Sequence, residues 1–386
     1  MNTNQDYSNT GLEYFSEFFD SFDDPRDSSR IRYPLVEVLF LCVCSILSGY
    51  ESNRGIENFG KLKLDWLRQY FPFEYGIPTH ETIADVIGFL DKRAFESAFV
   101  AWGNSYFGQS NGLLLHLDGK RLNNSAPRTL QSLKEEDGGQ RPHAIVNAYA
   151  SQSGIIVAHN SISEHNDERQ GAKDIIDQLN LKNATITADS NFCDKDILKR
   201  ILKKEGHYII ALKKSHPILY QLAEQYFDDV RMDKTCYHSE ETGHGRKESR
   251  TYLSMRVDFL PDQKFKEYPG LYRIVKVRRQ RTVLRKNKAS DETHYYITDL
   301  DQPVQYLAQS IRDHWRIENN LHWVLDVEFR EDESTKRTGH QAANFSLIRK
   351  MALNLINQKR GKKSIKATRM SCALSDQARS DILKLS

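Results

Sequence analysis

The order of apolar runs between residues 113 and 213 constrains the fold of this chain more than any other feature. Three short strand-like segments are followed by a helix, a strand, a second helix and a final strand. Short apolar runs bounded by turn residues are typical of buried strands, whereas periodic amphipathic segments are typical of helices. We expect strands at 113–118, 143–150, 155–163, 184–190 and 207–213, and helices at 170–179 and 193–206.

This order predicts an α/β fold in which helices flank a mixed five-stranded sheet, as in ribonuclease-H-like proteins. The first three strands are expected to form an antiparallel meander, and the last two to join the sheet in parallel orientation. In such a sheet the first and fourth strands are neighbours, although they lie far apart in the sequence.

The rest of the chain divides into segments around this core. Apolar spacing predicts helices before the core, charged β-like segments follow residue 224, and helices return from Val304. The expected divisions are a lead-in at 1–30, an N-terminal helical domain at 31–108, the first part of the core at 109–224, a β-rich insertion at 225–302, the second part of the core at 303–360, and a basic tail at 361–386.

Composition argues against several classes of protein. No apolar run reaches the roughly eighteen residues that a membrane span requires, so we expect no membrane association. The polar N-terminal stretch does not resemble a secretory signal. Five scattered cysteines without a CxxC pair suit a reducing cytoplasm better than a disulfide scaffold.

Two basic runs stand out in a chain whose net charge is only +3. Residues 275–288 contain seven Lys or Arg and no acid, and residues 336–370 contain ten and no acid. Either run alone could be a solvated surface, but two in one chain favour a polyanionic partner such as nucleic acid. We therefore expect Arg278, Arg279 and Arg281 to lie on the surface that faces this partner.

Two of the predicted strands end in an aspartate. Asp118 ends the first strand and Asp189 the fourth, so the neighbouring strand ends would bring the two carboxylates side by side. Adjacent carboxylates repel unless a proton or a cation intervenes, and oxygen ligands suit Mg²⁺ or Mn²⁺. The alternative is that each aspartate only caps the turn that follows it.

A third set of polar residues lies on one face of the predicted helix that ends near Val327. His314, Glu318, His322 and Asp326 are spaced by four residues. The face could be a zinc-type His and carboxylate site, a plain solvated surface, or the source of a third acid, Glu318, with the histidines in support. Three carboxylates that hold two divalent ions about 4 Å apart suit metal-dependent phosphodiester chemistry, and with the two aspartates present we favour the third acid.

Several segments resemble a known family. They are HLDGK (116–120), TADSNFCDKDI (187–197), GHYIIALK (206–213), GHGRKESR (243–250) and HWRIENNLHWVLDVEFREDES (314–334). Together with the N-terminal stretches DPR (24–26) and YPLVEVLFLCVCSILSGYES (33–52), they resemble the H-repeat-associated insertion-sequence transposases. These belong to the bacterial DDE transposases with an inserted β domain, and the resemblance runs from about residue 12 to the C-terminal tail.

The resemblance implies an activity and its residues. It places the family's catalytic, metal-binding acids on Asp118, Asp189 and Glu318, with two Mg²⁺ or Mn²⁺ ions per site. It implies an endonuclease and strand-transfer activity on double-stranded DNA, at terminal inverted repeats and a target, by a homodimer in the bacterial cytoplasm, associated with the nucleoid. It also implies that the N-terminal helical domain helps to bind transposon ends.

Further DNA-contacting residues are expected from the same segments. The GHGR segment contributes His244 and Arg246, and Lys120, His314 and His322 flank the acids. The wider superfamily favours a Tyr and an Arg before the Glu and a Lys after it, where this chain has Ile311, His314 and Leu325. These departures argue against a phosphate clamp built from that Tyr and Lys.

Other functions remain possible on the sequence alone. A transposase-derived protein that binds DNA without moving it would share the basic runs, and a ribonuclease-H-like nuclease would cut without joining. A metal phosphatase for small molecules is disfavoured by the basic runs. The intact acid set favours an active transposase.

Overall fold

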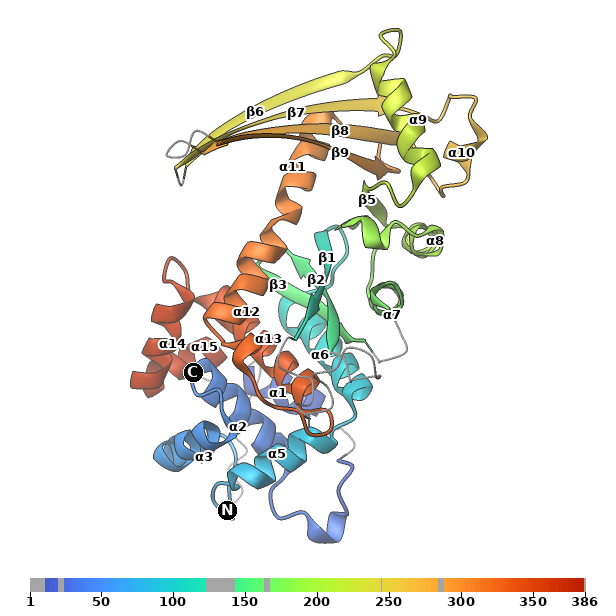
Figure 1. The fold of residues 1–386 in the computed structure, drawn as a ribbon. Helices are drawn as coiled ribbons and strands as arrows, with labels where there is room; N and C mark the ends of the chain where they lie inside the picture. The colour runs from blue at the N-terminus through green and yellow to red at the C-terminus, as the bar shows by residue number, and fades with distance from the viewer. Residues whose placement is uncertain are drawn as a thin grey trace, which may run out of the picture. The chain divides into compact units, whose positions relative to one another are not determined.

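The structure is a computed structural model that describes residues 11–19, 24–122, 143–162, 167–243, 245–283 and 288–384. The chain divides into two compact units (Figure 1). Unit 1 comprises residues 1–109, 119–167 and 318–386, and unit 2 comprises residues 110–118 and 168–317. Two of the four boundaries fall inside regular elements, at 118/119 within the first strand and at 317/318 within the helical segment that follows Val304.

One mixed sheet of nine strands runs through the described residues, in the order β3-β2-β1-β4-β5-β9-β8-β7-β6. The first five strands have the expected order, with the first and fourth adjacent and parallel and the second and third antiparallel. The prediction of a five-stranded sheet is wrong in its strand count. Strand β5 does not end the sheet, because β9 of the insertion pairs with it in antiparallel orientation and carries the sheet onward.

Unit 1 is mainly helical. Its elements are α1 (Gly11–Phe19), α2 (Leu35–Leu47), α3 (Asn53–Leu62), α4 (Leu64–Leu67), α5 (His80–Phe89), α6 (Lys92–Phe107), the C-terminal part of β1 (Leu114–Arg121), β2 (Ala144–Ala150), β3 (Ile155–Ser161), the π-helical turn η4 (Glu318–His322), α12 (Trp323–Val327), α13 (Gln341–Lys359), α14 (Ile365–Leu374) and α15 (Asp376–Leu383), with 3₁₀ turns η1 (Ser28–Arg30) and η5 (Glu331–Glu333).

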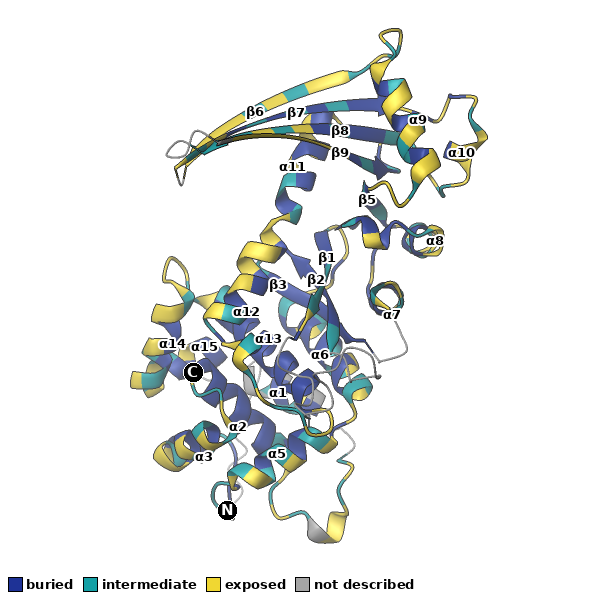
Figure 2. Ribbon diagram, viewed as in Figure 1, coloured by how far each residue is buried: buried dark blue, intermediate teal, exposed yellow. Residues whose placement is uncertain are grey.

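The core of unit 1 forms around α13. This helix is buried from Gln341 to Ile356 and packs against α2, α5, α6 and β3. Helix α2 is apolar on nearly all sides and is likewise buried, as the dark-blue ribbons in Figure 2 show. A helix that is apolar all round is stable only inside a core, which explains why α2 is not a surface helix.

Unit 2 carries the N-terminal part of β1 and the insertion. Its elements are α7 (Glu168–Gln178), β4 (Thr185–Ala188), η3 (Ser190–Phe192), α8 (Lys195–Lys203), β5 (His207–Leu212), α9 (Pro217–Asp228), β6 (Thr235–Gly243), β7 (Arg246–Arg256), α10 (Gln263–Lys266), β8 (Arg273–Val283), β9 (Lys288–Thr298) and α11 (Val304–His314).

Helices α9 and α11 cover opposite faces of the insertion strands. On one face the α9 rings of Tyr220 and Phe227 pack against Tyr295. On the other face Leu307 and Ile311 of α11 join a buried apolar cluster that includes residues of β7 and β8. Successive side chains of a strand point to opposite faces, and along β7 buried residues alternate with partly exposed ones.

Three segments differ from expectation. Strand β6 was not predicted, because its sequence TCYHSEETG is polar and mostly exposed. Residues 361–386, expected as a basic tail, contain the helices α14 and α15. The helix expected to run to Val327 is interrupted by the π-helical turn η4. None of the described helices has the length and apolar character needed to cross a membrane.

Candidate active site

The two strand-end aspartates lie at matched positions in unit 2. Strands β1 and β4 pair in parallel, with Leu117 opposite Ala188, so Asp118 and Asp189 follow at the next position of each strand. The Asp189 carboxylate also accepts a hydrogen bond of 2.9 Å from the backbone N–H of Asn191, and so it caps the 3₁₀ turn η3. Its second oxygen lies 3.9 Å from Nζ of Lys213. The capping contact that the alternative interpretation expected is therefore present.

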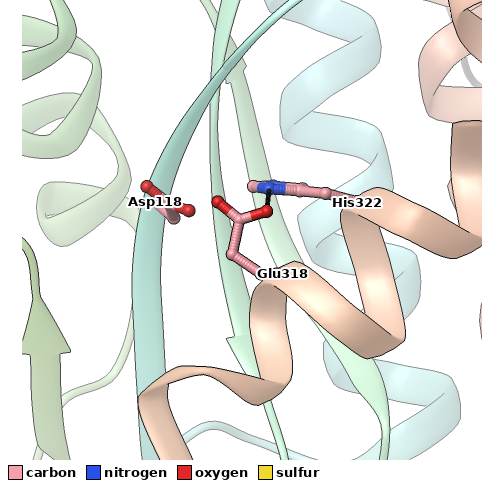
Figure 3. Close-up of side chains that lie close together, drawn as sticks. All are labelled: Asp118, Glu318 and His322. Carbon is pink, nitrogen blue, oxygen red and sulfur yellow. Dashed lines mark ion pairs between the residues drawn. The ribbon is translucent and has the colours of Figure 1, made fainter. Parts of the chain in front are cut away.

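The third acid lies on the π-helical turn of unit 1. Single π-helical turns inside α-helices are frequent at functional sites. The Glu318 side chain is about half exposed, and its Oε2 lies 3.5 Å from Nδ1 of the nearly buried His322. Figure 3 draws this pair together with Asp118 on its strand, three side chains whose oxygen and nitrogen atoms are suitable metal ligands.

A chain of buried polar groups lies behind His322 within unit 1. Asn147 Nδ2 is 3.4 Å from His322 Nε2, and Asn147 Oδ1 is 3.2 Å from His159 Nδ1. His159 Nε2 is in turn 4.0 Å from a carboxylate oxygen of Glu96. Burial holds the pKa of His159 well below its usual range and raises the pKa of Glu96. The apolar pattern did not predict this chain of polar groups, although Asn147 and His159 each interrupt an apolar strand in the sequence.

The histidine one turn before Glu318 is engaged within unit 2. His314 Nδ1 lies 2.8 Å from the hydroxyl of Thr187. The same hydroxyl lies 2.6 Å from Nδ1 of His116. His314 was expected to contact DNA, whereas its described contact is inside the fold.

Lys120 belongs to a buried ionic cluster of unit 1. Its ammonium pairs with Asp326 and lies 2.9 Å from Glu331 Oε2, and its side chain is only 8% exposed. Glu331 is fully buried, with its other oxygen 3.9 Å from Nζ of Lys350 and 2.7 Å from the hydroxyl of Ser346. Asp332 Oδ1 lies 3.9 Å from the same ammonium, so three carboxylates surround Lys120. Glu331 could not be recognised from the sequence, because the acidic run around it is typical of a solvated surface.

The basic run of β8 divides between the two faces of the insertion. Arg278 pairs with Asp291 at 2.6 Å and Arg279 with Glu292 at 2.7 Å. Since strand residues alternate, Arg278 lies on the α9 face, and Arg279 and Arg281 lie on the α11 face.

Further arginines share the α11 face. Arg246 Nε is 2.8 Å from Glu248 Oε1, and Arg281 Nε is 3.8 Å from the same oxygen. Arg312 of α11 pairs with Glu241 at 2.8 Å. We call Arg246, Arg250, Arg279, Arg281 and Arg312 the α11-face arginines. His244, also expected to contact DNA, lies outside the described residues.

The basic run of residues 336–370 is partly internal. Arg349, Lys350 and Arg369 are buried. Glu51 accepts from both Arg349 and Arg369, and Lys336 donates to the backbone oxygen of Glu51 at 2.6 Å. Burial lowers the pKa of Lys336 to about 7. These cations stabilise the packing of α2, α13 and α14, and they are not available to a polyanion.

Two carboxylates at adjacent strand ends offer oxygen ligands that suit divalent metal ions. Two known families match the chain. Residues 125–355 match the family described as the transposase DDE domain, and residues 16–103 match its DDE_Tnp_1-associated domain. The chain belongs to the DDE transposase family.

Two relatives illustrate the breadth of the match. YncI of Escherichia coli O157:H7 is 32% identical over 374 residues, which cover 94% of this chain and 92% of YncI. The H repeat-associated protein YhhI of Escherichia coli K12 is 31% identical over 353 residues, 89% of this chain and 90% of YhhI. The names of both proteins describe them as candidate transposases. Among solved structures, the piggyBac transposase synaptic complex with hairpin DNA matches with a TM-score of 0.43 and 9% identity, over 97% of this chain and 80% of that one.

Proposed function

We propose that this DDE transposase binds the terminal inverted repeats of its element, cuts the DNA at the ends, and joins the 3′-hydroxyls to target DNA. Asp118, Asp189 and Glu318 are proposed to hold two Mg²⁺ or Mn²⁺ ions. The observation that carries the proposal is the parallel pairing of β1 with β4, which gives Asp118 and Asp189 the same register. When bound, the ions would activate the attacking oxygen and stabilise the leaving oxygen.

The donor set suits hard divalent ions. Carboxylate oxygens at two adjacent strand ends are the ligands that Mg²⁺ and Mn²⁺ prefer. The strand order β3-β2-β1-β4-β5 is also the order of a ribonuclease-H-like core. Both points support an Asp, Asp and Glu site over a zinc site.

The position of Glu318 is supported by its helix. His314, one turn earlier, contacts Thr187, which lies two residues before Asp189. Glu318 lies four residues further along the chain, on the π-helical turn η4, and is proposed as the third acid.

His322, which lies beside Glu318, is proposed to have a supporting role. The Asn147 amide nitrogen can only donate, so Nε2 of a neutral His322 accepts from it and the ring proton resides on Nδ1. That N–H faces Glu318 Oε2. His322 is thus proposed to orient the glutamate.

DNA is proposed to lie along the exposed members of the α11-face arginines, since Arg250 is buried against Glu241 and Glu248. Five guanidinium groups share this face with the carboxylates of Glu241, Glu248 and Glu292, so it keeps a net positive charge. Helix α11 leads from this face directly into the turn with Glu318. A homodimer is proposed because two transposon ends need two acid sets.

The test is cleavage and strand transfer on DNA that carries the inverted repeats flanking this gene. Asp118→Asn, Asp189→Asn and Glu318→Gln are each expected to abolish Mg²⁺-dependent cleavage while DNA binding stays within twofold. Asp196→Asn, which changes a half-exposed acid of α8, serves as the matched control and should remain active. His322→Gln should reduce cleavage without abolishing it.

Other results of these cleavage and binding assays would each point to a different conclusion. Cleavage that survives loss of one acid removes that residue from the site. Cut ends that never join target DNA would indicate a nuclease, and binding without cleavage would indicate a DNA-binding protein derived from a transposase. Light scattering of the protein bound to paired ends tests the dimer.

A further inference from the structure

One threonine hydroxyl joins three elements of unit 2. Thr187 of β4 lies 2.6 Å from Nδ1 of His116 on β1 and 2.8 Å from Nδ1 of His314 on α11. The two imidazole rings meet edge to face, with centroids 5.8 Å apart. His116 and Thr187 are buried. We call these three residues the His–Thr–His layer.

Each member of the layer precedes one proposed catalytic acid by one structural period. His116 and Thr187 lie two residues before Asp118 and Asp189, and two residues is the repeat of a strand. His314 lies four residues before Glu318, which is about one helical turn. His116 and Thr187 are also direct register partners between β1 and β4. The layer therefore lies one strand repeat below Asp118 on β1 and Asp189 on β4, and His314 of α11 bonds to the same hydroxyl.

The chemistry of the layer fixes its geometry. A threonine hydroxyl has one proton to donate and lone pairs that accept, and each neutral imidazole has one donor and one acceptor nitrogen. With both neighbours bonded through Nδ1, the hydroxyl donates to one ring and accepts from the other. This requirement restrains the rotamers of all three side chains at once, and a restrained network in a buried setting holds its elements at a set distance.

We propose that Thr187 is a positioning residue that sets the spacing of Asp118 and Asp189 by holding β1, β4 and the last turn of α11 in register. This proposal rests on the proposed function.

The chain offers a matched control for the proposal. Thr185 lies two residues earlier on β4, and its hydroxyl is 3.4 Å from that of Tyr306 on α11. Tyr306 is eight residues, or about two turns, before His314. Thr185 therefore joins the same strand to the same helix, is similarly buried, and is one step further from the acids.

The experiment compares Thr187→Val, Thr187→Ser and Thr185→Val in the full chain. Each is titrated with Mg²⁺ in the cleavage assay, and DNA affinity and the urea midpoint are measured in parallel. Loss of a group that orients metal ligands typically weakens metal affinity or activity by about 10- to 100-fold. Thr187→Val should therefore raise the half-maximal Mg²⁺ concentration or lower kcat at least about tenfold, with unchanged DNA affinity. Thr187→Ser should restore most of the loss, and Thr185→Val should change either value less than twofold.

Equal effects of Thr187→Val and Thr185→Val on the Mg²⁺ titration would overturn the proposal, as would a defect that follows the urea midpoint alone. Failure of the proposed function looks different, because then the unaltered protein shows no Mg²⁺-dependent cleavage or keeps it in Asp118→Asn.

Discussion

Glu331 is expected to be among the residues of unit 1 least tolerant of a neutral substitution. Its carboxylate is fully buried and serves both Lys120 and Lys350. Burial alone would raise its pKa, but the two ammonium groups outweigh burial and hold the pKa of Glu331 well below its usual value. Glu331→Gln keeps the shape of the side chain and removes the charge.

The expected loss of unfolding free energy follows from the partners that Lys120 and Lys350 keep in Glu331→Gln. Lys120 keeps Asp326, whereas Lys350 keeps only the Ser346 contacts among its described partners. Removing one partner of a buried ion pair costs about 3–5 kcal/mol, a large part of the roughly 5–15 kcal/mol that stabilises a typical domain. Three of the four tryptophans lie in unit 1, so urea unfolding followed by tryptophan fluorescence reports mainly on this unit.

The loss of unfolding free energy in Glu331→Gln should also depend on pH. Burial, opposed by Glu331, brings the pKa of Lys350 to about 8, below its ordinary value of 10.5. Without Glu331 that pKa falls further, so between pH 7 and 8 the variant gains about 1.4 kcal/mol, roughly 1 kcal/mol more than the unaltered protein gains. The gap should therefore be smaller at pH 8 than at pH 7.

Two controls define the result. Glu333→Gln changes a neighbouring exposed acid and should cost less than about 0.5 kcal/mol. Glu331→Gln combined with Lys350→Met removes both partners and should recover a large part of the loss. A cost below about 1 kcal/mol for Glu331→Gln, or a gap that does not change with pH, would refute this account of the cluster.

Three further outcomes follow from the described contacts. Gly339→Ala should cost more than about 1 kcal/mol in urea unfolding, because Gly339 has a φ of +55° and an added Cβ would lie 2.6 Å from the backbone oxygen of Gly88; a neutral result would mean that this loop relaxes. The pKa of His159 lies well below its usual range, so the folded state keeps it neutral and unfolding free energy should fall by about 1.4 kcal/mol per pH unit below about pH 6.5. His159→Gln should remove that part of the slope, and an unchanged slope would contradict the assignment. Arg281→Ala should reduce the salt dependence of DNA binding by about one phosphate contact, whereas Arg278→Ala on the other face should not; equal effects would argue against the α11 face.

The sequence predicted the parts of the fold that depend on local pattern. Asp118 and Asp189 could be paired because each ends a short apolar run, and the order of those runs determines which strands are neighbours. Strand β6 could not be predicted, since it lies at the edge of the sheet and its side chains need not be apolar. The continuation of the sheet from β5 into β9 depends on pairing between residues about ninety positions apart, which local pattern does not contain.

Charge was the property least readable from the sequence. Lys120 reads as a free cation beside an acid, but its partners Asp326 and Glu331 are more than 200 positions away. The arginines of β8 read as a bare basic run, whereas the neighbouring strand supplies Asp291 and Glu292 across the sheet. A charge run shows where cations are in the chain, and only the fold shows which of them are already neutralised.

The pairing of β5 with β9 bears on how such genes decay. Strand β5 carries the buried residues Ile209, Ile210 and Leu212, and β9 covers the edge of the sheet at this strand. A gene copy that lost residues 235–298 by deletion would expose an apolar strand edge, which readily pairs with other chains. Such a remnant is expected to aggregate rather than persist as a smaller nuclease, so the insertion protects the core's solubility as well as extending its sheet.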